Sequence, residues 1–415
     1  MTTTATTTTG GAHWVDVARR HLMRTYPETD LVVVSGHGSW LVDSEGEEWL
    51  DLLSGIAVTS IGHAHPAVAA AVSDQAGRLV HTSNLFLTPP ALELAERLSG
   101  LIGWSDARVF FAQCGATANE AAIKLARRHG KLQQPGKVRV VTLEGGFHGR
   151  TLATLEATGQ AAKHEPFAPL AGFVDTVAHD DAAALTAAVG PDTCAVMLEV
   201  VQGEGGVRPL DPAFLAAARA ACDAHGALLI ADEVQTGVGR TGTWFAFQQT
   251  DIVPDVVTLA KALANGMPIG ACVAHGAAAD ALRPGEHATT FGGNPVTAAA
   301  ALAVIDVIES EGILAAVGTR AAQLRMGLAD IGARTGAVRE VRGVGLLLGV
   351  VLDGLDAGEV ARRCRGERLI VNAVGPDVLR LAPPLTLSAD EADLALGILG
   401  RAIEAVLADA RTEDA

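Results

Sequence analysis

Residues 227–232 (ALLIAD) and 256–261 (VVTLAK) are short apolar runs, and each of them ends in a charged side chain. Apolar runs of this length, bounded by Gly, Pro or Asp, are typical of buried β-strands. Six strands are expected, at 108–111, 137–143, 194–199, 227–231, 256–260 and 271–274. Helix-like stretches at 116–129 and 212–225 separate some of these strands. Strands that are apolar on both faces and alternate with helices predict an α/β fold with a mostly parallel central sheet.

The two flanks of this region have a different pattern, which predicts a smaller α+β domain. A hairpin is expected at 40–43 and 48–51, a long helix begins at Pro295, and two strands lie near 346–352 and 378–381. We expect residues 59–294 to form the large domain. Residues 11–58 and 295–415 are expected to form the small domain, and residues 1–10 a disordered tail.

Composition disfavours several classes of partner. The formal net charge of −16 over 415 residues argues against nucleic acid and anionic membranes. No apolar run is long enough to cross a bilayer, and the Thr-rich start has no secretory pattern. Five scattered cysteines favour the reducing cytoplasm. No metal is expected, since His63 and His65 lack further ligands at a recognisable spacing and are more simply part of a loop.

The charged ends of the two quoted runs are the strongest candidates for chemistry. Lys261 follows one strand and Asp232 ends another, and ligands bind at the carboxyl ends of parallel strands. A buried lysine has a lowered pKa and becomes a nucleophilic amine, although Lys261 could instead extend to solvent. Asp232 could hold a cationic ring nitrogen, or it could simply cap the next segment. The two residues are 29 positions apart, about one βαβ unit, so both could reach one pocket.

Three other segments could complete such a pocket. Small residues at 113–119 (QCGATAN) open a helix and could bind an anion through backbone N–H groups, although many such turns bind nothing. Residues 145–151 (GGFHGRT) offer an aromatic face and an arginine. Arg380 lies in an apolar setting and needs a partner; Glu204 is a candidate, and a purely structural ion pair is the alternative. Cys114 as a nucleophile has no histidine or asparagine tied to it by sequence.

Residues 237–242 (GVGRTG) match the Gly-x-Gly-x-x-Gly pattern of dinucleotide-binding proteins. The context does not fit, because the motif does not directly follow a strand and residues 243–245 (TWF) stand where a helix should open. A nicotinamide-dependent dehydrogenase therefore remains only an alternative hypothesis.

Taken in order, the motifs resemble the class III aminotransferases, which have the type I fold of pyridoxal-phosphate enzymes. The resemblance runs from about residue 22 to 407. It is carried by 54–58 (SGIAV), 62–66 (GHAHP), 83–86 (SNLF), 147–151 (FHGRT), 202–209 (QGEGGVRP), 232–237 (DEVQTG), 290–295 (TFGGNP) and 371–372 (VN) with Arg380. Within the class, the chain is most similar to the branch that moves the δ-amino group of N2-acetyl-L-ornithine to 2-oxoglutarate in arginine biosynthesis. It departs from the usual pattern at Cys114 (usually Ser), Thr117 (usually Glu) and Val200 (usually Pro).

The resemblance implies how pyridoxal 5′-phosphate would be held. Lys261 would bind the cofactor covalently and move the proton, Asp232 would hold the pyridine nitrogen, and Gln235 would contact the ring hydroxyl. The remaining cofactor contacts would be Phe147 and Val234 on the ring faces, Gly115 and Ala116 on the phosphate, and Thr290 reaching that phosphate from a neighbouring subunit. A homodimer with shared active sites is therefore implied.

The resemblance also implies the substrate contacts. Arg150 would bind the carboxylate at the far end of the substrate, with Thr289 close by. Arg380 would bind the α-carboxylate of glutamate or 2-oxoglutarate, and Glu204 would neutralise Arg380 when the ω-amino substrate is bound. The alternatives are another ω-aminotransferase, acting on ornithine, succinylornithine, 4-aminobutyrate or a modified lysine, and a binding protein that keeps the fold without turnover.

Overall fold

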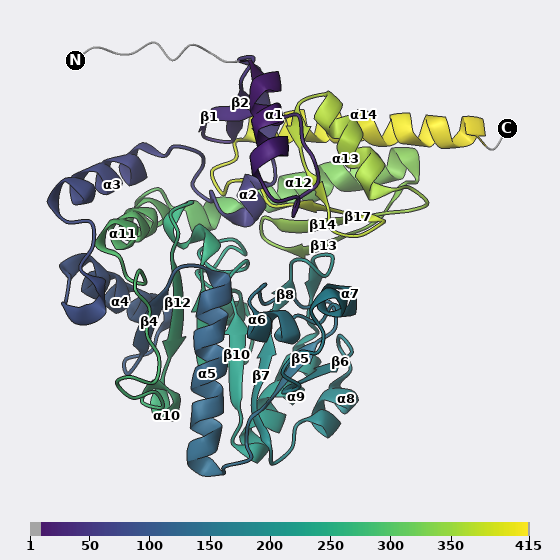
Figure 1. The fold of residues 1–415 in the computed structure, drawn as a ribbon. Helices are drawn as coiled ribbons and strands as arrows, with labels where there is room; N and C mark the ends of the chain where they lie inside the picture. Colours follow the sequence, from purple (N-terminus) through teal and green to yellow (C-terminus); the bar gives the residue numbers. More distant parts are fainter. Residues whose placement is uncertain (1–9, 414–415) are drawn as a thin grey trace.

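A seven-stranded sheet forms the centre of the large domain (Figure 1). Its order is β4 (Arg108–Ala112), β12 (Gly270–Ala274), β11 (Val256–Leu259), β10 (Leu228–Asp232), β7 (Thr193–Leu198), β5 (Arg139–Leu143) and β6 (Val174–Val177). Only β12 runs against its two neighbours, so the prediction of a mostly parallel sheet is confirmed. Every residue of β7 and β10 is buried, which explains why these strands are apolar on both faces.

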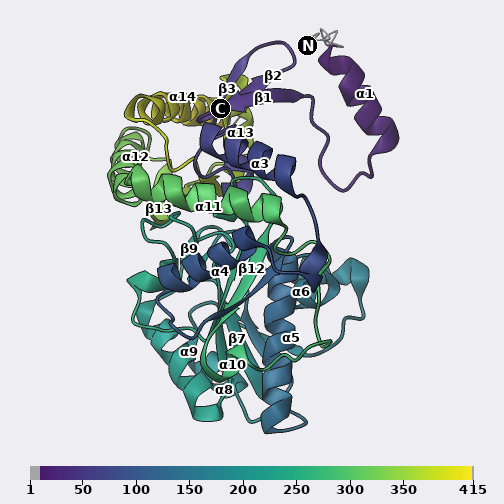
Figure 2. The same cartoon turned by 90° about the vertical axis from the view of Figure 1, so that its left-hand side faces the viewer.

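Helices cover both faces of this sheet. In Figure 2, α5 (Gly115–Gln133) lies on one side of it, and α8 (Ala182–Ala188) and α9 (Pro212–His225) lie on the other. At one edge of the domain, α3 (Pro66–Arg78) and α4 (Pro89–Ile102) pack against α11 (Pro295–Ser310). Shorter helices α6 (Leu152–Ala157) and α7 (Ala161–His164) follow β5. Helices therefore flank the ends of the strands, where the candidate residues lie.

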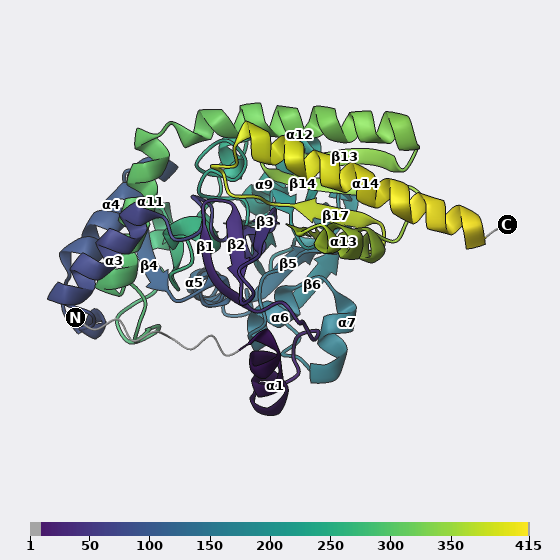
Figure 3. The same cartoon turned by 90° about the horizontal axis from the view of Figure 1, so that it is seen from above.

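The small domain is built from both ends of the chain (Figures 1 and 3). One antiparallel sheet has the order β13 (Val338–Val344), β14 (Leu347–Leu352), β17 (Val378–Leu381) and β16 (Asn372–Ala373). A second joins β1 (Val33–His37), β2 (Trp40–Asp43) and β3 (Glu48–Asp51) to β15 (Leu369–Ile370). The helices are α12 (Ile313–Thr335), α13 (Ala357–Gly366) and α14 (Ala389–Glu413). The pairing of β3 with β15 ties the N-terminal hairpin to the C-terminal part of the chain.

The computed structural model describes residues 10–413, with side chains described to residue 410. The predicted tail at 1–10 lies outside the described residues except for Gly10, and the domain limits 11–58, 59–294 and 295–415 stay our proposal. Strands β2, β3 and β17 and helix α9 have the predicted bounds, whereas β6 was not predicted. Among the described residues, no helix combines the length and apolar character needed to cross a membrane.

The glycine-rich motif at 237–242 forms turns between strand β10 and the segment that leads to β11. Its central side chain, Arg240, is completely buried, and burial lowers its pKa to about 9. The guanidinium donates to Leu346 O at 3.0 Å, to Pro383 O at 2.5 Å and to Ser60 Oγ at 3.3 Å. The motif thus anchors the small domain to the large one.

Candidate active site

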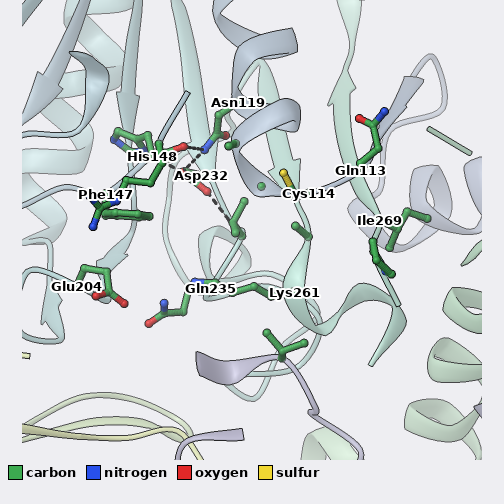
Figure 4. Close-up of a pocket in the computed structure, with 18 of the residues that line it drawn as sticks. Gln113, Cys114, Asn119, Phe147, His148, Glu204, Asp232, Gln235, Lys261 and Ile269 are labelled. Atoms are coloured by element: carbon green, nitrogen blue, oxygen red, sulfur yellow. Dashed lines mark hydrogen bonds and ion pairs between the residues drawn. The ribbon is translucent and has the colours of Figure 1, made fainter. Parts of the chain in front are cut away.

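One cavity of about 400 Å³ lies at the carboxyl ends of β10 and β11 and collects residues from most of the candidate segments (Figure 4). The predicted site residues that line it are Gly115, Ala116, Phe147, Arg150, Glu204, Asp232, Val234, Gln235 and Lys261. Asp232 and Lys261 therefore share one pocket, as their spacing suggested. Val58, from the N-terminal part of the chain, also reaches this cavity.

Asp232 is buried and is held by several donors. Its Oδ2 lies 2.7 Å from His148 Nδ1 and accepts a bond from Asn119 Nδ2 at 2.8 Å. Its Oδ1 accepts from Val234 N at 3.0 Å. Burial alone would lower the pKa of His148, but the hydrogen bond and charge of Asp232 raise that pKa. The arrangement fixes a carboxyl group deep in the pocket, where it can pair with a cationic ring.

Glu199 is a second buried carboxyl group at the cavity. It accepts hydrogen bonds from Phe147 N at 2.9 Å and from Gly203 N at 3.1 Å. Burial raises the pKa of Glu199 to about 7, and the nearby His148 opposes that shift. This side chain ties the loop that carries Phe147 to the loop that carries Glu204.

Lys261 begins a short 3₁₀ turn directly after β11 and has a φ of +42°. Non-glycine residues rarely adopt this left-handed conformation, and such backbone geometry is found most often at functional sites. Burial lowers the pKa of the Lys261 amine to about 8, with Glu204 raising it and Arg380 lowering it further. A larger fraction of this amine is therefore neutral near pH 7–8 than for an exposed lysine, which makes it a better nucleophile.

This shift predicts how the protein takes up an aldehyde. When the cofactor-free enzyme is mixed with pyridoxal 5′-phosphate, we expect the rate of covalent capture to rise with pH around a midpoint near 8. The physical reason is that only the neutral amine attacks the carbonyl carbon. Stopped-flow absorbance across a pH series measures the midpoint, and a value near that of free lysine would contradict the burial argument.

The start of helix α5 lines the cavity and suits an anion. Gly115 and Ala116 are its first residues, so their backbone N–H groups have no partner within the helix, and the helix dipole favours an anion there. A Cβ on Gly115 would lie 2.7 Å from Val234 Cγ1, so only glycine fits beside that side chain. Thr117, in place of an acidic residue, donates from Oγ1 to Cys114 O at 3.0 Å and accepts from Cys114 N and Gln113 N, both at 3.1 Å.

Arg380 is buried, with only 1% of its side chain exposed, and it contacts two residues that line the cavity. It forms an ion pair with Glu204, donates to Gln235 Oε1 at 3.1 Å and contacts Asn372 Oδ1 at 3.3 Å. Although burial would raise the pKa of Glu204, the charge of Arg380 lowers it. The predicted pairing of Glu204 with Arg380 is thus present, and the Glu204 side chain keeps 31% exposure on the cavity side.

The remaining candidates lie at the edges. Arg150 is exposed, with its guanidinium 5.5 Å from the centre of the Phe147 ring. Thr289 Oγ1 accepts a hydrogen bond from Gln113 Nε2 at 2.5 Å, so it lies next to a cavity residue without lining the cavity. Thr290 is exposed and borders a separate surface hollow with Asn84 and Leu85.

Three residues were not predicted as site residues: His148, Asn119 and Glu199. The first two lie within motifs that the sequence pattern indicated, but their roles depend on contact with Asp232, 84 and 113 positions away. Glu199 ends the run 194–199 as Asp232 ends its own, and a charged residue at a strand end was the available signal. No group of three or more His, Cys, Asp or Glu side chains in the described residues could hold a metal ion.

The residues present fit pyridoxal 5′-phosphate. The cavity offers a buried carboxylate for the ring nitrogen, an amine of lowered pKa for the aldehyde, and free N–H groups for the phosphate. It also contains a buried, unpaired acceptor, Asn119 Oδ1. The cavity thus combines the carboxylate of Asp232, the amine of Lys261 and the N–H groups at the start of α5, which are the three kinds of group that this cofactor requires.

Comparison with known proteins agrees with this geometry. Residues 22–403 match the family model "Aminotransferase class-III". The chain is 48% identical to the acetylornithine aminotransferase of Streptomyces coelicolor over 94% of this chain and 96% of that one. It is 49% identical to the one of Mycolicibacterium smegmatis, covering 88% and 92%.

Solved structures of aminotransferases also superpose on this fold. The ornithine aminotransferase of Toxoplasma gondii superposes with a TM-score of 0.92 at 29% identity, covering 96% of both chains. The N-acetylornithine aminotransferase of Stenotrophomonas maltophilia superposes with a TM-score of 0.81 at 39% identity, covering 95% of this chain and all of that one.

Proposed function

The chain belongs to the class III aminotransferases, and from this premise we propose that its amino donor is N2-acetyl-L-ornithine. The δ-amino group would pass to 2-oxoglutarate, giving N-acetyl-L-glutamate 5-semialdehyde and L-glutamate, a step of arginine biosynthesis. The observation that carries the proposal is the Glu204–Arg380 pair beside Lys261, a cation that can be neutralised or released within the pocket. The two relatives of nearly 50% identity support the choice of donor.

Bound pyridoxal 5′-phosphate supplies an electron-withdrawing ring that accepts electrons from the bond broken at the amine-bearing carbon. Asp232 would stabilise the positive charge on the ring nitrogen, and His148 and Asn119 fix the position of this carboxylate. Phe147 and Val234 would confine the ring, Gln235 would contact its hydroxyl, and Lys261 Nζ would move the proton at the reacting carbon. The lowered pKa of Lys261 suits that task, because an effective proton carrier has a pKa near the working pH.

Two amino donors must use the same pocket in different ways. Glutamate reacts at its α-amine and brings an α-carboxylate to the reacting centre, where Arg380 would bind it in a forked pair. Acetylornithine reacts at its terminal amine, so no carboxylate lies there, and Glu204 would then keep Arg380 neutralised. Arg150, at the exposed rim, would take the carboxylate at the other end of the substrate, close to Thr289.

Arg380→Gln is expected to affect the two half-reactions unequally. The glutamate half-reaction should lose about 10²–10³-fold in kcat/KM, because charge-assisted bonds to a carboxylate contribute about 1.5–3 kcal/mol each. The acetylornithine half-reaction should change far less. Single-turnover absorbance with each donor separates the effects, and equal losses with both donors would contradict the assigned role of Arg380.

A comparison of donors tests the proposed function directly. Initial rates with acetylornithine, ornithine, succinylornithine, 4-aminobutyrate and lysine, each with 2-oxoglutarate, give a ranking by kcat/KM. We expect acetylornithine to rank first or to share that place with succinylornithine. A clear preference for 4-aminobutyrate or ornithine would replace the proposal with another ω-aminotransferase activity.

We also propose a homodimer with shared active sites. Large apolar side chains are exposed near the segment that contains Thr290. Their exposed fractions are 55% for Val80, 84% for Leu85, 70% for Phe86, 83% for Leu87 and 60% for Phe291. Asn84 Nδ2 donates to Thr289 O at 3.1 Å and to Gly292 O at 3.0 Å, so the two segments are joined. Such a concentration of exposed apolar groups is typical of an interface.

The dimer is tested by changing this patch without changing the pocket. Phe86→Glu should convert a dimer into a monomer in light scattering and should weaken cofactor retention, because Thr290 of a neighbouring subunit would reach the phosphate. Met326→Glu, at an apolar side chain that is 65% exposed on α12, is the matched control and should leave the mass unchanged. A wild-type monomer that keeps full activity would overturn the shared-site proposal.

We place the enzyme in the cytoplasm. All five cysteines are free thiols in the structure, and four of them are buried. The reducing cytoplasm is the compartment in which such thiols persist.

A further inference from the structure

A second cavity, of about 510 Å³, lies at the boundary between the two domains. Its walls include His179 and Arg208 of the large domain, together with Arg325 on α12 and Arg342 on β13 of the small domain. This cavity shares no lining residue with the active-site cavity. It lies beside the loop that continues from Glu204 to Arg208, which forms part of both regions.

The three arginines of this boundary cavity are poorly neutralised. Arg325 donates to Val341 O at 2.9 Å and to Gly343 O at 2.6 Å, which are neutral acceptors. Arg342 donates from Nε to Gly206 O at 2.8 Å, and its nearest carboxylate, on Glu340, is 3.8 Å away. Among the described residues, neither Arg208 nor Arg325 has a carboxylate within ion-pair distance. Burial lowers the pKa of both Arg325 and Arg342; the charge of Glu340 opposes this shift at Arg342, and the nearby Arg208 adds to it.

Three carboxyl groups also line the boundary cavity, those of Asp180, Asp211 and Glu340, and none of them is within ion-pair distance of Arg208 or Arg325 in the described part of the chain. Asp180 Oδ1 accepts from Asp211 N at 3.0 Å, and Asp211 Oδ1 accepts from Ala213 N at 2.7 Å to cap α9. These backbone N–H groups fix the position of both carboxyl groups without neutralising them. The side chain of Glu340 is 53% exposed, so water screens much of its charge.

His179 adds a buried imidazole whose contacts with Asp180 and with the backbone of Arg208 are poorly aligned. Its side chain is only 5% exposed, and neither ring nitrogen makes a well-formed hydrogen bond. Its Nδ1 lies 3.1 Å from Asp180 Oδ2 without hydrogen-bond geometry. Burial and the charge of Arg208 lower the pKa of His179, whereas Asp180 and a hydrogen bond with the backbone of Arg208 raise it. A buried imidazole without a partner is costly unless a ligand satisfies it.

We propose that this boundary cavity is a binding site for a small, multiply charged oxyanion, either phosphate or a tricarboxylate, held by Arg208, Arg342 and His179. Guanidinium groups and a neutral imidazole N–H are the donors that such an anion prefers. Because the donors come from both domains, the bound anion would hold the domains together at this edge. It would also act on the Glu204 loop, since Arg342 donates to Gly206 O, two residues from Glu204.

Calorimetric titration of the cofactor-loaded enzyme tests the proposal. Inorganic phosphate and citrate are titrated separately at constant ionic strength, with sodium chloride as the reference salt. We expect saturable binding of at least one of the two anions, and the stronger one identifies the preferred oxyanion class. Arg208→Ala should weaken that binding at least about tenfold, which is the loss expected when one charge-assisted contact of about 1.5–3 kcal/mol is removed.

Arg339→Ala is the matched control. Arg339 lies on the same strand as Arg342, is 56% exposed and pairs with Asp377 outside the boundary cavity, so its removal should leave the affinity unchanged. Arg208 is exposed and has no ion pair among the described residues, so Arg208→Ala is expected to fold normally. The proposal is overturned if neither anion binds more strongly than chloride, or if Arg208→Ala binds as well as the wild type. Binding to the substrate arginine, Arg380, would give that second result.

Discussion

Lys261→Ala is expected to abolish transamination, with kcat falling by about 10⁴-fold or more. Proton transfer by a positioned side chain contributes up to about 10⁴-fold, and the covalent hold on the cofactor is lost as well. The fold should survive, because burial already disfavours the charged form of this lysine and its removal relieves that cost. Steady-state turnover, together with the visible absorbance of the bound cofactor, measures the effect.

Two controls separate chemistry from damage to the fold. Lys124→Ala removes a lysine that binds Glu286 O at 3.1 Å, away from the cavity, and should leave turnover intact. Added methylamine should partly restore the rate of Lys261→Ala, because a free amine can move the proton that Nζ no longer moves. Normal turnover in Lys261→Ala would refute the assigned site.

Asp232→Asn has the second largest expected effect, a fall in the rate of the chemical step of about 10²–10⁴-fold. The substitution keeps the shape of the side chain but removes the charge that stabilises the cationic ring nitrogen. Removing one partner of a buried charge pair costs about 3–5 kcal/mol, and each 1.36 kcal/mol corresponds to a factor of ten. Single-turnover kinetics with a saturating amino donor report the loss in the chemical step itself.

The state of His148 provides an independent readout of the same change. Asp232 raises the pKa of this imidazole against the effect of burial, so Asp232→Asn should lower it, and NMR of labelled histidine can follow the change. Asp255→Asn is the matched control, because Asp255 pairs with Arg219 at 2.8 Å outside the cavity. That variant should lose stability and retain its kinetic constants. A loss of activity in Asp255→Asn equal to that in Asp232→Asn would point to general destabilisation.

Local sequence predicts which residues meet in the cavity when those residues lie at strand ends. Asp232 ends one apolar strand and Lys261 closely follows another, and the carboxyl ends of parallel strands lie at a common edge, so the pattern predicts that the two side chains share one pocket, as the structure has them. A charge in an apolar strand requires a partner, which predicts one for Arg380, and Glu204 is that partner. The context of the glycine-rich motif at 237–242 argues against dinucleotide binding, and the motif is a series of turns that holds a buried arginine.

The amino-acid sequence by itself determined the fold class, the strands of the central sheet except β6, and the placement of Asp232 and Lys261 in one pocket, because periodicity and strand ends are local properties of the chain. Only the tertiary structure decided which groups support them. His148 and Asn119 orient Asp232 across 84 and 113 positions, and Arg342 reaches the Glu204 loop from the other domain. Hydrogen bonds act over about 3 Å in space regardless of separation along the chain, so such partners become visible only when the folded backbone brings them together.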